Sequence, residues 1–184
     1  TLTVPGKLCR ITGCSGVGNL PLSIAERQRS AALLALANQP GDSFPPAEIE
    51  LVDAPGPGRG TFLFLRAETE TALAGFSSLG ALGKRAEAVG TEAAAELCRH
   101  LATCAPLDPH LADQLVPILA LCPGESSFAT SRITRHLLTN LWVVNLFLPL
   151  NVQVEGCEGE PGTLTISPDS SPRKWKGACP SPIS

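Results

Sequence analysis

The stretch that most constrains the fold is residues 134–147, which is apolar at almost every position. Its pattern is helical, and a helix that is apolar nearly all round is normally a buried one. The run is too short to span a bilayer, and Asn140 and Asn145 interrupt it. We therefore expect a core helix in a protein that does not cross a membrane.

His136 and Asn140 lie four residues apart at the start of this helix and project together from one face. In the first turn, the positive end of the helix dipole disfavours a charged imidazole, and the free backbone N–H groups can bind an anion. A neutral imidazole beside a phosphate is what a histidine nucleophile needs to attack phosphorus. A core histidine with satisfied hydrogen bonds fits the pattern equally well.

A second helix is predicted just after residue 108, with Asp108 as N-cap and Pro109 in the first helical position. One stripe is apolar: Leu111, Leu115, Ile118 and Leu119. The other stripe contains His110, Asp113, Gln114 and Pro117. Pro117 is expected to kink the helix because it has no N–H to donate. Periodicity alone favours an ordinary amphipathic helix with a solvated polar face.

The upstream half predicts a small unit in which helices cover one face of a sheet, an α+β fold. The expected order is a strand (7–14), a small-residue loop (13–18), a helix from a capping box at Ser23–Glu26 to Asn38, a linker (40–46), strands (47–53, 61–67 and 74–79) and a helix (84–103). Gly90 is a weak point of that last helix. The turn at 55–60 lacks the Lys–Ser/Thr pair of a phosphate loop and is interpreted as a plain turn. Downstream, two strands (150–154 and 162–166) form a closing hairpin.

Composition narrows the class of protein further. The 184 residues, 43% of them hydrophobic, can form one sizeable domain or two small ones. The net charge of −3 argues against a general electrostatic nucleic-acid binder. Seven cysteines without C-x-x-C or paired histidine spacing indicate no zinc site, but reduced, mostly buried thiols in an intracellular protein, cytoplasmic or nuclear. The lack of any Met suggests a fragment of a longer product.

Several short motifs resemble the C-terminal half of RNA 3′-terminal phosphate cyclases. The more specific ones are Leu111-Ala112-Asp113-Gln114-Leu115, Gly124-Glu125-Ser126, His136-Leu137-Leu138-Thr139-Asn140 and Phe147-Leu148-Pro149. Upstream, Asn19-Leu20-Pro21, Ala25-Glu26-Arg27, the turn at 56–60, Gly83-Lys84, Ala86-Glu87 and Val89-Gly90 are also similar to the family. The resemblance spans residues 8–150, and the family's upstream glycine-triplet signature is absent.

The resemblance implies a domain organisation. Residues 1–104 would be the family's inserted α+β domain, which has a thioredoxin-like topology, and residues 105–166 the last repeat of the catalytic domain. Residues 167–184, rich in Pro and Ser, would be a disordered tail. Because the chain has no C-x-x-C, no redox chemistry transfers with that topology.

The resemblance also implies an ATP-dependent ligase that converts an RNA 3′-terminal phosphate to a 2′,3′-cyclic phosphate through an adenylated histidine, here His136. Five residues match positions around ATP: His110, Leu111, Ala112, Asp113 and Gln114. His110 stands where many relatives stack an aromatic ring on adenine. No metal ligand is assigned, because the divalent metal (Mg²⁺ or Mn²⁺) would be bound mainly by the missing N-terminal half. Arg132 and Arg135, beside His136, are candidates for phosphate contacts.

Two other functions stay open at this point. Within the family, a non-catalytic cyclase-like protein of ribosome assembly lacks the nucleophilic histidine, so the intact motif at 136–140 favours the enzyme. Outside it, the chain would be a plain α+β interaction module with His136 in its core. We expect RNA 3′ ends, ATP and the missing half as partners, and no membrane. With only two helices and a hairpin representing the catalytic domain, the apolar helix should keep one face open, and the chain alone should be inactive.

Overall fold

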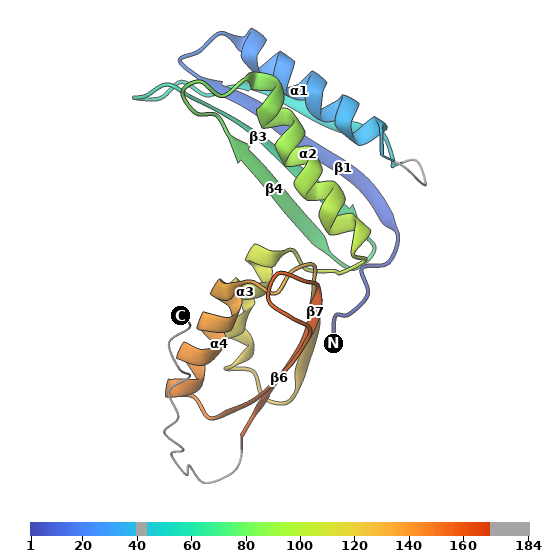
Figure 1. Ribbon diagram of the computed structural model, residues 1–184, viewed down its shortest axis with the longest axis vertical. Helices are drawn as coiled ribbons and strands as arrows, with labels where there is room; N and C mark the ends of the chain where they lie inside the picture. Colours follow the sequence, from blue (N-terminus) through green and yellow to red (C-terminus); the bar gives the residue numbers. More distant parts are fainter. Residues whose placement is uncertain (40–43, 170–184) are drawn as a thin grey trace.

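The computed structural model describes residues 1–39 and 44–169, which form two units with separate sheets (Figure 1). The first unit contains β1 (Leu8–Gly18), α1 (Leu22–Ala37), β2 (Ala47–Asp53), β3 (Gly60–Thr69), β4 (Leu73–Leu79) and α2 (Ala86–Ala102). The second unit contains α3 (Pro109–Leu119), β5 (Ser126–Thr130), α4 (Arg135–Phe147), β6 (Leu150–Glu155) and β7 (Gly162–Pro168). The predicted α+β class is confirmed. The tail at 170–184 lies outside the described residues, as do 40–43 of the predicted linker.

The sheet of the first unit has the strand order β2-β1-β3-β4. β1 and β2 are parallel, joined by α1, and the other two pairings are antiparallel. Both helices lie against the same face of this sheet, as expected (Figure 1). The core between them is aliphatic except for Phe76, with Ile11, Leu63, Leu65, Val89 and Leu97 at its centre. The likeness to thioredoxin folds stays a prediction.

β1 continues four residues beyond the predicted strand, so the loop predicted at 13–18 is wrong. The small residues there leave space for side chains of the neighbouring strand and do not form a turn. A Cβ built on Gly16 would lie 2.3 Å from the ring of Phe62, which pairs with it across β3. Glycine within a strand often marks such a close approach and not the end of the strand.

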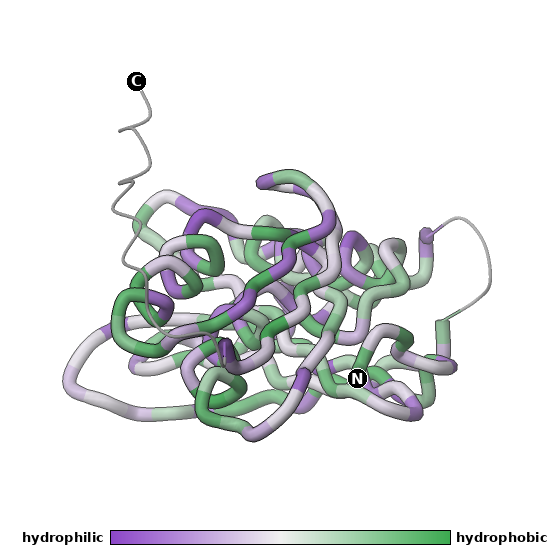
Figure 2. Tube along the Cα trace, turned by 90° about the horizontal axis from the view of Figure 1, so that it is seen from below, coloured by the Kyte–Doolittle hydropathy of each residue, from purple (hydrophilic) through white to green (hydrophobic). Residues whose placement is uncertain are grey.

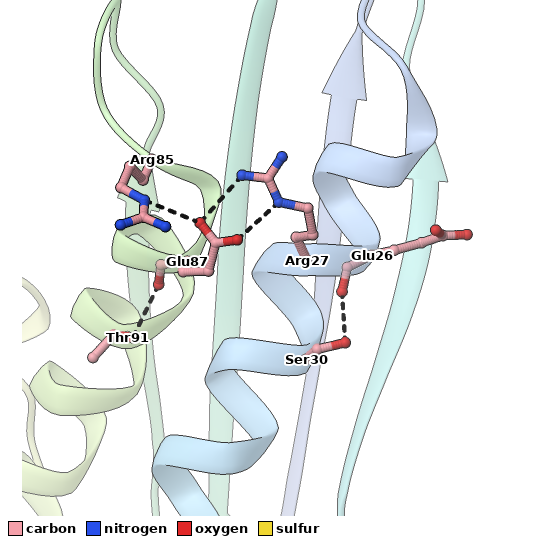
Figure 3. Close-up of polar contacts among 6 residues, drawn as sticks. All are labelled: Glu26, Arg27, Ser30, Arg85, Glu87 and Thr91. Carbon is pink, nitrogen blue, oxygen red and sulfur yellow. Dashed lines mark hydrogen bonds and ion pairs between the residues drawn. The ribbon is translucent and has the colours of Figure 1, made fainter.

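The two helices of the first unit meet at Gly90. A Cβ there would lie 2.1 Å from the Gln28 carbonyl oxygen, so the glycine interpreted as a weak point is the contact that lets α2 lie against α1. Beside it, the Arg27 guanidinium binds the Glu87 carboxylate, with Nε–Oε1 2.8 Å and Nη2–Oε2 3.2 Å (Figure 3). The predicted capping box is wrong, because α1 begins after Pro21 and no side chain caps it.

The second unit has a three-stranded antiparallel sheet of order β5-β7-β6. β6 and β7 extend the predicted hairpin, but β5 was not expected, so the unit holds more than two helices and a hairpin. Hydrophobic and hydrophilic residues are interspersed along much of the Cα trace (Figure 2). The second core is centred on Ile133, Leu137, Leu164 and Ile166 and shares no residue with the first.

The chain enters and leaves the first unit at one strand edge. Leu2 pairs in parallel with Phe128 of β5, and Leu107 pairs in parallel with Thr130 of the same strand. Leu2 N donates to the Ser127 carbonyl at 2.8 Å, and Ser131 N donates to the Leu107 carbonyl at 3.0 Å. The first unit is thus inserted between two segments that are each bridged to β5 of the second sheet.

The thiols differ from expectation. Among the described residues, Cys9, Cys104 and Cys157 are exposed and Cys14, Cys98 and Cys122 are half-buried, so the prediction of mostly buried thiols is wrong. All six are free. Cys179 lies outside the described residues. None of the described helices combines the length and apolar character that a membrane crossing requires.

Candidate functional site

His136 lies in the first turn of α4. Thr134 caps this helix, its Oγ1 accepting from Leu137 N at 3.1 Å. The imidazole of His136 is exposed and makes no hydrogen bond or ion pair with any other described residue. The interpretation of His136 as a core residue is therefore wrong. The accessible ring lies in the first turn of α4, where backbone N–H groups can bind an anion, and the role of His136 as a nucleophile stays a prediction.

α3 begins at the predicted cap. Asp108 Oδ1 accepts from His110 N and from Leu111 N, both at 2.9 Å, and Pro109 follows in the first turn. The predicted apolar stripe is displaced, because the buried residues are Pro109, Ala112 and Val116. Leu111, Leu115 and Leu119 pack at the border of the second core, and Ile118 is 60% exposed. Small side chains at the centre let the helix approach closely and place the leucines to either side.

The five residues expected around ATP spread over the width of α3. His110 and Gln114 are exposed, and Leu111 and Asp113 are half-buried. Ala112 is completely buried in the second core, so only its backbone could meet a ligand. Their contact with a nucleotide stays a prediction.

One hydrogen bond links α3 to α4. Asn140 Nδ2 donates to the Asp113 carbonyl oxygen at 3.1 Å. Asn140 lies one helical turn after His136 on the same face, so this bond ties the face that carries the histidine to the middle of α3. The motifs at 111–115 and 136–140 are therefore in direct contact through Asn140, a contact that the sequence did not predict.

α4 is a half-open helix. Only Leu137 and Leu141 are buried, although the whole helix is apolar. Trp142 is 47% exposed, Leu146 51% and Phe147 73%. The expectation of a core helix is thus wrong for this chain, whereas the expected open face is confirmed.

The two arginines near His136 differ in their surroundings. Arg135 Nε lies 3.2 Å from Glu158 Oε1, so its charge is already paired. The Arg132 guanidinium binds no other described residue and lines a cavity between the two units. The sequence predicts the same phosphate-binding role for both arginines, but in the structure only Arg132 has an unpaired guanidinium.

His100 was missed in the sequence. It is 5% exposed, its ring centroid lies 5.3 Å from that of Phe76, and its Nδ1 has no partner among the described residues. Burial lowers the pKa of the imidazole, and the Asp108 carboxylate opposes this shift. The signal was present, because His100 continues the buried spacing of Ala93 and Leu97 along α2. The described residues contain no group of three or more His, Cys, Asp or Glu able to hold a metal.

A two-unit α+β fold, with one unit inserted at a strand edge of the other, is the class of protein that these observations define. The family model for the RNA 3′-terminal phosphate cyclase (RTC) insert domain matches residues 3–102. The chain belongs to this family.

Curated relatives extend the match beyond the insert domain. RNA 3′-terminal phosphate cyclase of Methanopyrus kandleri is 40% identical over 171 residues, which is 89% of this chain and 47% of the relative. The cyclase of Thermococcus kodakarensis is 43% identical over 154 residues (84% and 43%), and that of Methylococcus capsulatus 42% over 161 residues (88% and 44%). The chain therefore spans less than half the length of these relatives and corresponds to their C-terminal half.

Proposed function

We propose that this chain is the C-terminal half of an ATP-dependent RNA 3′-terminal phosphate cyclase in which His136 becomes adenylated. The observation that carries the proposal is the accessible imidazole at the start of α4, which has no hydrogen-bond or ion-pair partner among the described residues. One turn later, Asn140 bonds the same helix to α3. Family membership supports the class of reaction, since the matched relatives are named as cyclases.

The proposed reaction has three displacements at phosphorus. An imidazole nitrogen of His136 attacks the α-phosphorus of ATP, a P–N bond forms, and pyrophosphate leaves while the ring loses its proton to solvent. An oxygen of the RNA 3′-phosphate then attacks the same phosphorus, which breaks the P–N bond and leaves AMP joined to the RNA end. Finally the adjacent 2′-hydroxyl loses its proton to solvent and its oxygen attacks the 3′-phosphorus, which closes the 2′,3′-cyclic phosphate and breaks the bond to AMP. AMP is needed because an unmodified phosphate has no good leaving group.

This chain would supply the nucleophile and one wall of the nucleotide site. The N-terminal end of α4 would provide backbone N–H donors for phosphate oxygens. On α3, the exposed His110 and Gln114 and the half-buried Asp113 would contact ATP. The described residues contain no cluster that fits a metal site, so a divalent cation would be held mainly by the other half.

The rest of the catalytic domain would cover the open face of α4. Trp142 (47% exposed) and Leu146 (51%) leave apolar side chains open on a helix whose sequence is suited to burial on all sides. Because the net charge of this chain is −3, the positive charge that RNA binding requires would come from that other half. The chain alone is therefore expected to be inactive.

The test is covalent labelling. This chain would be joined to the N-terminal half of the Methanopyrus relative and incubated with α-labelled ATP and a divalent cation. Acid-labile label on the protein is expected, and His136→Asn should remove it because Asn has no nucleophilic ring nitrogen. The matched control is His110→Asn on the facing helix. That variant should bind ATP more weakly but still take up label at saturating ATP.

Three results would contradict parts of the proposal. Covalent AMP retained by His136→Asn would exclude this histidine as the nucleophile. A folded chimera that binds ATP and RNA without labelling would instead support a non-catalytic cyclase-like protein. Self-adenylation by the 184 residues alone would overturn the requirement for the other half.

A further inference from the structure

A cavity of about 350 Å³ lies where the two units meet. The last turns of α2 form one wall, and the loop after β5 and the turn between β6 and β7 form the other. In Figure 1 this is the region where the end of α2 approaches the second unit. Cavities of this size at the boundary of two units are common places for small ligands. The site does not include α3 residues 110–114, where ATP is proposed to bind.

The cavity contains donors without protein partners. Arg132 and Ser131 are consecutive lining residues after β5, and the side chain of neither binds another described residue. Ser131 is 8% exposed, so its hydroxyl is held in a sheltered position. An unpaired guanidinium presents a fork of N–H donors that suits phosphate oxygens.

The opposite wall combines apolar rings with an unsatisfied polar atom. Phe76 and His100 line the cavity and are 7% and 5% exposed. His100 Nδ1 has no hydrogen-bond partner among the described residues. Buried polar atoms in native proteins normally have one, so this buried nitrogen leaves an unfilled hydrogen bond in the wall of the cavity. Pro109 and Pro161 complete a rigid apolar surface.

The charges of the lining limit what can bind. Glu96 is paired with Arg99 at 2.8 Å, so that pair contributes little net charge. Glu160 has no pairing side chain among the described residues and opposes an anion. One free arginine against one free carboxylate suits a single phosphate group better than a polyphosphate.

We propose that this junction cavity binds one nucleotide unit of an RNA strand, its phosphate on Arg132 and Ser131 and its ribose and base against the Phe76–His100 wall. The choice of RNA rests on the proposed function, whereas the nucleotide chemistry rests on the cavity. The same loop leads through the Thr134 cap to His136, so a strand held here would be positioned by the segment that presents the histidine.

The experiment is a titration of the ¹⁵N-labelled 184-residue chain, followed through its backbone amide signals. The probes are uridine 5′-monophosphate, which lacks the adenine of ATP, uridine without phosphate, and a five-nucleotide uridine strand. With the nucleotide, the amides of Ser131, Arg132, Gly159 and Glu160 should shift together. Uridine should bind more weakly. If the occupant is part of an RNA strand, the pentanucleotide binds at least as tightly as the mononucleotide.

Three charge variants separate a built site from general attraction. Arg132→Gln should weaken nucleotide binding about tenfold or more, the effect of losing charge-assisted hydrogen bonds. Glu160→Gln should tighten it about two- to fivefold. Arg135→Gln is the matched control, because Arg135 lies three residues away but is paired outside the cavity, and it should change nothing.

Equal losses in Arg132→Gln and Arg135→Gln, or shifts confined to α3, would overturn the cavity site. Exclusion of the pentanucleotide while the mononucleotide binds would overturn the assignment to RNA. These outcomes are independent of the labelling test, since the cavity binds or fails to bind whether or not His136 accepts AMP.

Discussion

Gly90→Ala should destabilise the protein, although alanine is the better helix former. In an isolated helix this change contributes about 1 kcal/mol of stability. Here the new Cβ would lie 2.1 Å from the Gln28 carbonyl oxygen and 3.0 Å from Ala32 N, both backbone atoms. Ordinary contact begins near 3.4 Å, so α1 would have to move away from α2 by more than 1 Å.

Any such movement of α1 would lower the free energy of unfolding. It would disturb the buried bonds of Gln28, whose side chain receives a hydrogen bond from Ser15 and donates one to Thr61, at 2.9 and 2.7 Å. Overpacking a core costs about 1–3 kcal/mol, and a backbone clash belongs at the upper end of that range. After subtracting the gain in helix propensity, we expect a net loss of about 2 kcal/mol in the free energy of unfolding.

The assay is urea unfolding followed by far-ultraviolet circular dichroism. Thr91→Ala is the control, because it also introduces alanine, at the next and exposed position of α2. It should change the free energy of unfolding by no more than about 0.5 kcal/mol. A Gly90→Ala protein as stable as the wild type would refute the close approach of the two helices.

Two further predictions concern single contacts. The Arg27 guanidinium, helped by the Glu87 backbone N–H and by Arg85, lowers the pKa of Glu87 from 4.5 to about 2. The ionised carboxylate therefore supports the fold fully above about pH 4.5 and loses its effect as the pH falls toward 2. Arg27→Gln should move the Glu87 pKa back toward 4.5 in a ¹³C carboxyl titration, while an unchanged value would contradict the pairing in Figure 3. Asn140→Ala removes the bond to the Asp113 carbonyl and should cost about 1 kcal/mol in urea unfolding, against little change for the exposed Asn151→Ala. Equal losses in both variants would mean that Asn140 does not fasten α3 to α4.

The sequence by itself determined the elements whose signals are local. Strand β2 has the predicted limits, and the Asp108 cap forms as its side-chain chemistry requires. The order of strands and helices in the first unit, its α+β class and the family were also readable, because periodicity, capping and short motifs depend on neighbouring residues. The first-turn position of His136 belongs to the same group.

The tertiary structure decided whatever depends on a distant partner. Gly16 lies in a strand because the Phe62 ring needs its space, and the polar β5 exists because β7 supplies its hydrogen bonds. Gln28 is completely buried because Ser15 and Thr61 satisfy its amide. An apolar helix such as α4 is suited to burial by its composition, but only neighbouring elements can bury it, and within the described residues they cover one face alone. The sequence shows that the α4 side chains favour burial, but a second packing surface is needed to bury them.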